Sequence, residues 1–151
     1  MSTTYISAEL RRQVTARAED LCEYCLIHAD DTFLGCEVDH IISEKHGGAT
    51  EAENLALACL VCNRNKGSDI ASLVPGLDTL ARFFNPRTDS WREHFRLDND
   101  GVTIASITEI GEVTARILGF NSRERLLERQ ALQIAGRFPT IEALRRIDGD
   151  V

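Results

Sequence analysis

The sequence predicts an α+β fold in which a helix precedes a small metal-stapled core, and a β-hairpin and further helices follow it. Three observations predict it. The chain has 151 residues, which suits one compact core with an appendage rather than two large domains. Four of its five cysteines form two Cys-x-x-Cys pairs, Cys22/Cys25 and Cys59/Cys62. Short strand-like stretches come before residue 108, and helical spacing dominates after it.

A helix is expected directly before the first cysteine pair. Ser7 is a favourable N-cap, and Leu10, Val14 and Ala18 recur at helical spacing on one face. The helix should therefore run to about residue 19.

A short strand is expected between the two cysteine pairs. Residues 36–42 are rich in β-branched and apolar side chains, with Asp39 and His40 near their end, and Gly47-Gly48 then breaks the strand. Successive strand residues point to opposite faces. Asp39 and His40 can therefore face one point only if the strand ends or twists there, and we expect a bulge or a loop.

The segments around the second cysteine pair are more ambiguous. Residues 50–53 match a capping box, and residues 54–58 fit either a helix or a strand, of which we favour a strand for the second half. Residues 63–66 are expected to open a helix that ends near Gly67 or restarts through residues 69–73.

The last part of the chain predicts a hairpin and two helices. The turn residues 98–101 favour pairing of residues 94–97 with 102–107. Helical spacing then covers residues 109–118 and 122–137. These helices carry no motif, and they are candidates for packing or for contact with a partner protein or a second copy of the chain.

Composition and charge exclude several classes of protein. Apolar residues make up 43% and charged residues 27%, as in ordinary globular chains and unlike disordered or collagen-like ones. The net charge of −7 argues against a protein that coats nucleic acid or anionic membranes. Residues 19–53 hold ten acidic residues and one basic one, whereas residues 59–97 hold six basic and four acidic ones. Any contact with nucleic acid must therefore be local.

The sequence predicts no association with a membrane. Its longest apolar stretches, such as residues 54–61, fall far short of the roughly 18–20 residues of a membrane helix. The first residues lack the basic start and apolar core of a secretory signal. We expect a cytoplasmic protein.

The cysteine pairs predict a zinc site. Four thiolates at about 2.3 Å complete a tetrahedral shell, and a closed shell leaves no position for water, so this ion would be structural. The ligands would be Cys22, Cys25, Cys59 and Cys62. Buried small cysteines and a redox-active pair are the alternatives. Cys36 and His28 lack matching partners and are interpreted as ordinary core or loop residues.

The residues between and after the cysteine pairs carry a family resemblance. The order Glu37–Ile41, His46–Gly48, Glu53–Cys59 and Asn63–Gly67 resembles the zinc-stapled branch of the HNH endonucleases over about residues 11–68. Residues 84–95 look like the downstream region of certain bacterial members. The resemblance implies a ββα-metal core at residues 8–75, on which an extension of residues 76–151 packs.

The resemblance also implies which residues form the catalytic site. Asp39 would bind a divalent cation, His40 would act as the general base, and Asn54 would fix the loop that orients His40. The family's last histidine is replaced by Asn63, which makes the chain an H-N-N variant. An amide oxygen can ligate a hard cation, so Mg²⁺ or Mn²⁺ is the expected catalytic ion. Alternatively, Asn63 caps the following helix and the Asp-His pair is a surface turn.

These residue types suit hydrolysis of a phosphodiester on chemical grounds alone, apart from the family resemblance. An imidazole can take a proton from water near neutral pH, and a cation can stabilise the charge that gathers on a phosphodiester as it breaks. Arg64 and Lys66, and with less support His46, are candidate substrate contacts. Arg82, Arg87, Arg92 and Arg96 could extend this basic track, but a solvated face is the simpler interpretation.

The leading hypothesis is therefore a metal-dependent endonuclease that hydrolyses DNA, with duplex DNA a better candidate than RNA. The alternative is a zinc-stabilised module that binds nucleic acid or serves as a scaffold and has lost its catalytic site.

Overall fold

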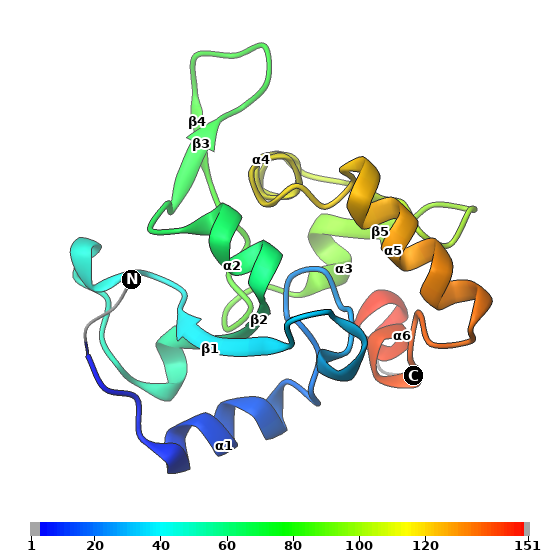
Figure 1. The fold of residues 1–151 in the computed structure, drawn as a ribbon. Coiled ribbons are helices and arrows are strands. Elements are labelled where there is room, and N and C mark those ends of the chain that lie inside the picture. The colour runs from blue at the N-terminus through cyan, green and yellow to red at the C-terminus, as the bar shows by residue number, and fades with distance from the viewer. Residues whose placement is uncertain (1–3, 150–151) are drawn as a thin grey trace.

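The computed structural model describes residues 4–149 and forms an α+β fold with three small antiparallel sheets (Figure 1). In chain order the elements are α1 (Ala8–Arg17), η1 (Ala29–Asp31), β1 (Cys36–His40), η2 (Glu44–His46), η3 (Ala52–Asn54), β2 (Leu55–Cys59), α2 (Leu60–Lys66), β3 (Ala71–Leu73), β4 (Leu80–Arg82), α3 (Trp91–His94), β5 (Phe95–Leu97), β6 (Ile104–Ser106), α4 (Glu109–Leu118), α5 (Arg123–Ile134) and α6 (Ile141–Asp148).

Helix α1 begins where the sequence predicts. The Ser7 side chain accepts a hydrogen bond from the backbone N–H of Leu10, which satisfies one of the free donors of the first turn. Val14 and Ala18 are fully buried. They pack with Leu55 and Leu57 of β2 in a small apolar cluster, so α1 is fixed against the central ladder.

Strands β1 and β2 form the ladder at the centre of the predicted core. Their register runs from Cys36 opposite Cys59 to His40 opposite Leu55, with no bulge. Of the expected bulge or loop at Asp39 and His40, the loop is confirmed, because the ladder has no bulge and the strand ends at His40. A loop follows directly, so Asp39 and His40 lie at the C-terminal end of the strand.

The capping box expected at residues 50–53 does not form. η3 begins after Glu51, whose side chain makes no capping bond. The Thr50 hydroxyl instead bonds the imidazole of His40, a long-range contact that local sequence patterns do not reveal.

Helix α2 begins at Leu60, three residues before the expected start. Its N-cap is Cys59, whose sulfur accepts from the backbone N–H of Cys62. The interpretation of Asn63 as a helix cap is therefore wrong, because Asn63 lies inside the helix.

Of the two alternatives for this helix, the end near Gly67 is confirmed and the restart through residues 69–73 is wrong. Residues 71–73 form β3 and pair with β4 as a hairpin that projects from the rest of the molecule (Figure 1). The Arg116 guanidinium holds its base by donating to the Leu73 carbonyl oxygen at 2.6 Å and to the Ser72 hydroxyl at 3.1 Å. These two bonds come from α4, far along the chain, so a short apolar run was not enough to distinguish strand from helix.

The C-terminal part confirms the predicted hairpin and helices and adds two short helices, α3 and α6. Strands β5 and β6 pair antiparallel, and α4 spans the expected residues. Helix α5 ends at Ile134 rather than at residue 137. Hydroxyl side chains cap α4, α5 and α6, because the Thr108, Ser122 and Thr140 oxygens each accept a backbone N–H in the first turn.

The main apolar core joins both halves of the chain. The four paired cysteines lie in one buried cluster with the aromatic side chains of the C-terminal half. The indole N–H of Trp91 donates to the Tyr24 carbonyl oxygen at 2.9 Å, and the Asn65 amide donates to the Leu118 carbonyl oxygen at 2.8 Å. In the part of the chain that the structure describes, no helix has the length and apolar character needed to cross a bilayer.

Candidate metal and catalytic site

The two cysteine pairs come together in three dimensions. The sulfur atoms of Cys22, Cys25, Cys59 and Cys62 lie within 4.8 Å of one another, and all four residues are buried. The Sγ atoms of Cys25 and Cys59 are 3.8 Å apart, which matches the edge of roughly 3.8 Å expected for a tetrahedron with 2.3 Å zinc–sulfur bonds. The donor set and its spacing therefore fit one zinc ion.

A guanidinium from the C-terminal half reaches these sulfurs. Arg125 of α5 is buried, and its Nη2 donates to Cys25 Sγ at 2.8 Å and to Cys59 Sγ at 3.4 Å. Burial raises the pKa of the Cys25 thiol, but hydrogen bonds with the other cysteines and the charge of Arg125 outweigh it and lower that pKa well below its ordinary value. The site thus favours thiolate at Cys25, the form that binds metal.

Asp39 and His40 lie side by side at the end of β1. The Asp39 carboxylate is one-third exposed, whereas the His40 imidazole is buried. His40 Nδ1 lies 3.8 Å from Asp39 Oδ1 and has no hydrogen-bond partner among the described residues. A buried polar atom without a partner is unusual and calls for an explanation.

The other imidazole nitrogen of His40, Nε2, has a hydrogen-bond partner. His40 Nε2 lies 2.8 Å from the Thr50 hydroxyl, which in turn donates to Glu44 Oε1 at 3.4 Å. The hydroxyl proton is used in the bond to Glu44, so the Thr50 oxygen is placed to accept from Nε2–H. This arrangement favours the tautomer that leaves the lone pair on Nδ1.

Asn54 fixes the loop that follows His40. Its Oδ1 accepts from the Ile42 N–H at 3.0 Å, and its Nδ2 donates to the carbonyl oxygens of Ile42 and Ala49, both at 2.9 Å. The backbone adds a bond from the Ile41 N–H to the Asn54 carbonyl oxygen at 2.8 Å. The loop is therefore closed by one side chain. Asn54 makes no direct hydrogen bond with the imidazole among the described contacts.

Two neighbouring hollows meet at Asp39. Asp39 and His40 line one of about 390 Å³. Asp39 also lines another of about 720 Å³ together with Asn63 and Arg64 of α2. Gly67 borders both. The structure thus brings Asp39 together with His40 on one side and with Asn63 on the other.

The three candidate substrate contacts differ in exposure. Arg64 and His46 are exposed. Lys66 is buried, and its ammonium donates to the His40 carbonyl oxygen at 3.5 Å. Burial lowers the pKa of Lys66. The Lys66 side chain therefore supports the end of β1 from within.

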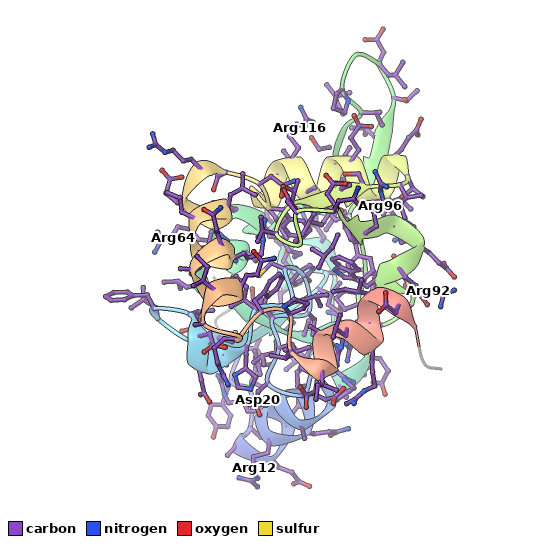
Figure 2. All side chains as sticks on the ribbon, turned by 90° about the vertical axis from the view of Figure 1, so that its right-hand side faces the viewer. Arg12, Asp20, Arg64, Arg92, Arg96 and Arg116 are labelled. Carbon is purple, nitrogen blue, oxygen red and sulfur yellow. The ribbon has the colours of Figure 1, made fainter. Side chains whose placement is uncertain are left out.

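The downstream arginines do not form a single basic track. Arg82 pairs with Asp89, Arg87 with Glu23, and Arg96 with Asp98. Arg64, Arg92 and Arg116 lie on different sides of the molecule (Figure 2). Arg82 and Arg96 are exposed and paired with local acids, which fits the solvated-face interpretation, whereas the Arg87 side chain is largely buried and does not fit it.

Comparison with known proteins identifies the central segment. Residues 22–69 match the family model described as HNH endonuclease. Over these residues the chain is similar to the HNH endonucleases. The match includes both cysteine pairs together with Asp39, His40, Asn54 and Asn63. No curated protein and no solved structure matches the chain.

Two contacts of the site were missed by the sequence prediction. Thr50 was interpreted as part of a capping box, although a hydroxyl ten residues after a candidate histidine is a signal that could have been examined. Arg125 lies 100 residues from Cys25, and nothing in its local sequence indicates a thiolate partner.

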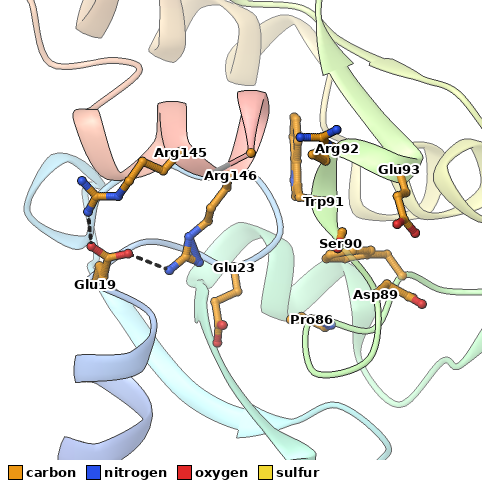
Figure 3. A pocket seen from close by; sticks show the side chains of 12 residues that line it. Glu19, Glu23, Pro86, Asp89, Ser90, Trp91, Arg92, Glu93, Arg145 and Arg146 are labelled. Atoms are coloured by element: carbon orange, nitrogen blue, oxygen red, sulfur yellow. Dashed lines mark hydrogen bonds and ion pairs between the residues drawn. The ribbon is translucent and has the colours of Figure 1, made fainter. Parts of the chain in front are cut away.

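A further hollow, of about 570 Å³, lies away from Asp39 and His40, between α6 and α3 (Figure 3). Two of its arginines pair with one carboxylate, since Glu19 lies 2.7 Å from Arg145 and 3.4 Å from Arg146. Glu23 binds the Leu57 N–H at 2.9 Å and also pairs with Arg87. The two ion pairs of Glu19 connect α6 to the turn that follows α1.

Proposed function

We propose that this chain is a metal-dependent endonuclease that hydrolyses phosphodiester bonds in DNA. One observation carries the proposal. In a segment that matches the HNH endonuclease model, a buried histidine lies beside a carboxylate, and one of its ring nitrogens is hydrogen-bonded while the other has no partner among the described residues. Such a nitrogen is arranged to accept a proton from a water molecule.

His40 is the proposed general base. Thr50 holds its Nε2 and so orients Nδ1 toward Asp39. Asn54 closes the loop after His40 and thereby fixes the direction in which the imidazole points.

Asp39 and Asn63 are the proposed ligands of a hard divalent cation. Their side chains offer a carboxylate and an amide oxygen, the donors that Mg²⁺ and Mn²⁺ prefer, and both residues line the same hollow. The bound ion would stabilise negative charge on the phosphoryl oxygens. The zinc at the four cysteines has a closed shell, and we assign it a structural role.

The proposed reaction uses one water molecule. Its oxygen forms a bond to phosphorus while His40 takes its proton, and the bond from phosphorus to the 3′ oxygen breaks with its electron pair. The 3′ oxygen gains a proton from solvent, and His40 returns its proton to solvent. The products are a 5′-phosphate and a 3′-hydroxyl.

Contact with DNA should be local and sensitive to salt. The chain is acidic overall, and most downstream arginines already pair with acids. Exposed Arg64, which lines the hollow with Asp39 and Asn63, is the proposed phosphate contact, and exposed His46 is a second candidate. We leave out Lys66 because its ammonium is buried.

The proposal is tested with supercoiled plasmid in Mg²⁺ or Mn²⁺. Wild-type protein should convert it to nicked or linear DNA, and His40→Ala should lower the rate by about 10²-fold or more. His28→Ala is the matched control, since that imidazole caps η1 and lies beside Asp30, away from Asp39 and His40. Zinc content and circular dichroism must be equal in all three proteins. Equal cleavage by His40→Ala would overturn the assignment, and no cleavage by wild type would favour a module that binds without cutting.

A further inference from the structure

The zinc centre is in contact with a helix that lies outside the HNH segment. Arg125 is in the first turn of α5, and it is 3% exposed. Its Nη2 is within hydrogen-bond distance of one sulfur from each cysteine pair, Cys25 Sγ at 2.8 Å and Cys59 Sγ at 3.4 Å. A single guanidinium therefore bridges the two halves of the metal-binding cluster.

A charge argument explains why a cation is needed there. Four thiolates around Zn²⁺ carry a net charge of −2, and these sulfurs are buried. The only backbone N–H bonds to these sulfurs in the described residues are from Cys25 to Cys22 Sγ at 3.5 Å and from Cys62 to Cys59 Sγ at 3.4 Å. Neither brings a full charge. Arg125 supplies one, next to the sulfurs that carry the negative charge.

The Arg125 side chain is itself held in place. Glu128, one turn along α5, binds Nη1 at 2.8 Å. This ion pair leaves Nη2 directed at the sulfurs. Carboxylates that fix a group next to a metal ligand are a common outer shell of metal sites, and their loss weakens metal binding.

We infer that Arg125 completes the zinc centre from the C-terminal extension, offsetting part of the negative charge of the four thiolates and slowing release of the ion. The extension is then a component of the metal site as well as a packing element. This inference depends on the cysteine cluster and not on nuclease activity, so it can fail or hold independently of the proposed function.

The test compares full-length, zinc-loaded variants. Arg125→Met removes the charge and keeps an apolar side chain, Arg125→Lys keeps the charge without the planar fork, and Glu128→Gln removes the ion pair that orients Arg125. The matched control is Arg129→Met. Arg129 is a fully buried arginine one turn further along α5, and it donates to the Val102 and Phe120 carbonyl oxygens rather than to sulfur.

The first measurement is the rate at which zinc passes to a coloured chelator. Arg125→Met should release zinc about 10-fold faster than wild type or more, with Arg125→Lys and Glu128→Gln between the two. Arg129→Met should stay within about twofold of wild type, even though it removes comparable buried contacts. If Arg125→Met does not fold, the lysine and glutamine variants decide the result.

The second measurement is spectroscopic. With Co²⁺ in place of zinc, the sulfur-to-cobalt charge-transfer band should move to longer wavelength in Arg125→Met, because the thiolates lose a charged hydrogen-bond donor. The band should not move in Arg129→Met. Wild-type release rates and an unshifted band in the Arg125 variants would overturn the inference, as would an equal acceleration in Arg129→Met, which would indicate general loosening of the fold.

Discussion

The side-chain amide of Asn54 makes two hydrogen bonds with the backbone of Ile42. Its oxygen accepts from the Ile42 N–H at 3.0 Å, and its nitrogen donates to the Ile42 carbonyl oxygen at 2.9 Å. Two such bonds fix the orientation of the peptide units directly after His40. The loop leaves no room for a side chain at Gly48. A Cβ on Gly48 would lie 1.7 Å from the Ile42 carbonyl oxygen and 2.7 Å from Asn54 Nδ2.

Gly48→Ala should therefore open the loop. The added methyl group displaces the Asn54 amide, so we expect faster hydrogen exchange at the Ile42 amide and a large loss of DNA cleavage. Gly47→Ala is the neighbouring control. It meets no atom within 4 Å, although its φ of +87° makes alanine unfavourable, and we expect a stability loss of about 1 kcal/mol with the loop intact. Equal exchange rates at Ile42 in the two variants would contradict this account.

The bond between Thr50 and His40 predicts a difference between two small substitutions. Thr50→Val keeps the shape and removes the hydroxyl, so the imidazole loses its anchor. We expect the turnover rate to fall about 10- to 100-fold with little change in KM. Thr50→Ser keeps the hydroxyl and should retain most of the activity. A fall in both variants to the same extent would indicate a packing role for this residue instead.

Asn63 predicts a change in metal preference. Asn63→His places a softer nitrogen donor beside Asp39 and restores the histidine of the family pattern. Cleavage supported by Ni²⁺ or Co²⁺ should increase relative to cleavage in Mg²⁺. Rates in a series of divalent ions, compared between wild type and variant, provide the measurement. An unchanged order of ions would place Asn63 outside the metal shell.

Cys59 and Cys36 face each other across the ladder and should respond differently to substitution. Cys59→Ala removes one of the four clustered sulfurs and the N-cap of α2, so we expect loss of bound zinc together with the native fold. Cys36→Ala should keep about one zinc per chain. Metal analysis and circular dichroism distinguish the two, and zinc retention in Cys59→Ala would exclude this cysteine as a ligand.

The sequence predicts best the parts that depend on short spacings. The cap at Ser7, the strand expected at residues 36–42 and formed at 36–40, and the cysteine quartet are all determined by neighbouring residues or by a fixed ligand geometry. For residues 69–73 a helical restart was one of two alternatives, whereas residues 71–73 form a strand that receives hydrogen bonds from the distant Arg116. The contacts of Thr50 and Arg125 are fixed by tertiary packing and leave no local pattern.

The spacing of the ladder also limits where the chain can be lengthened. Between Cys36 and Lys66, strands β1 and β2 and helix α2 carry two of the clustered cysteines and the side chains that line the hollows at Asp39, so one extra residue within these elements would shift a sulfur or a cleft side chain out of place. The turn at residues 75–78 is different, because all four residues are exposed at the tip of the projecting hairpin. A fluorescent reporter or affinity tag inserted at this tip should leave metal binding unchanged, which makes it the natural attachment point for studies of this protein in cells.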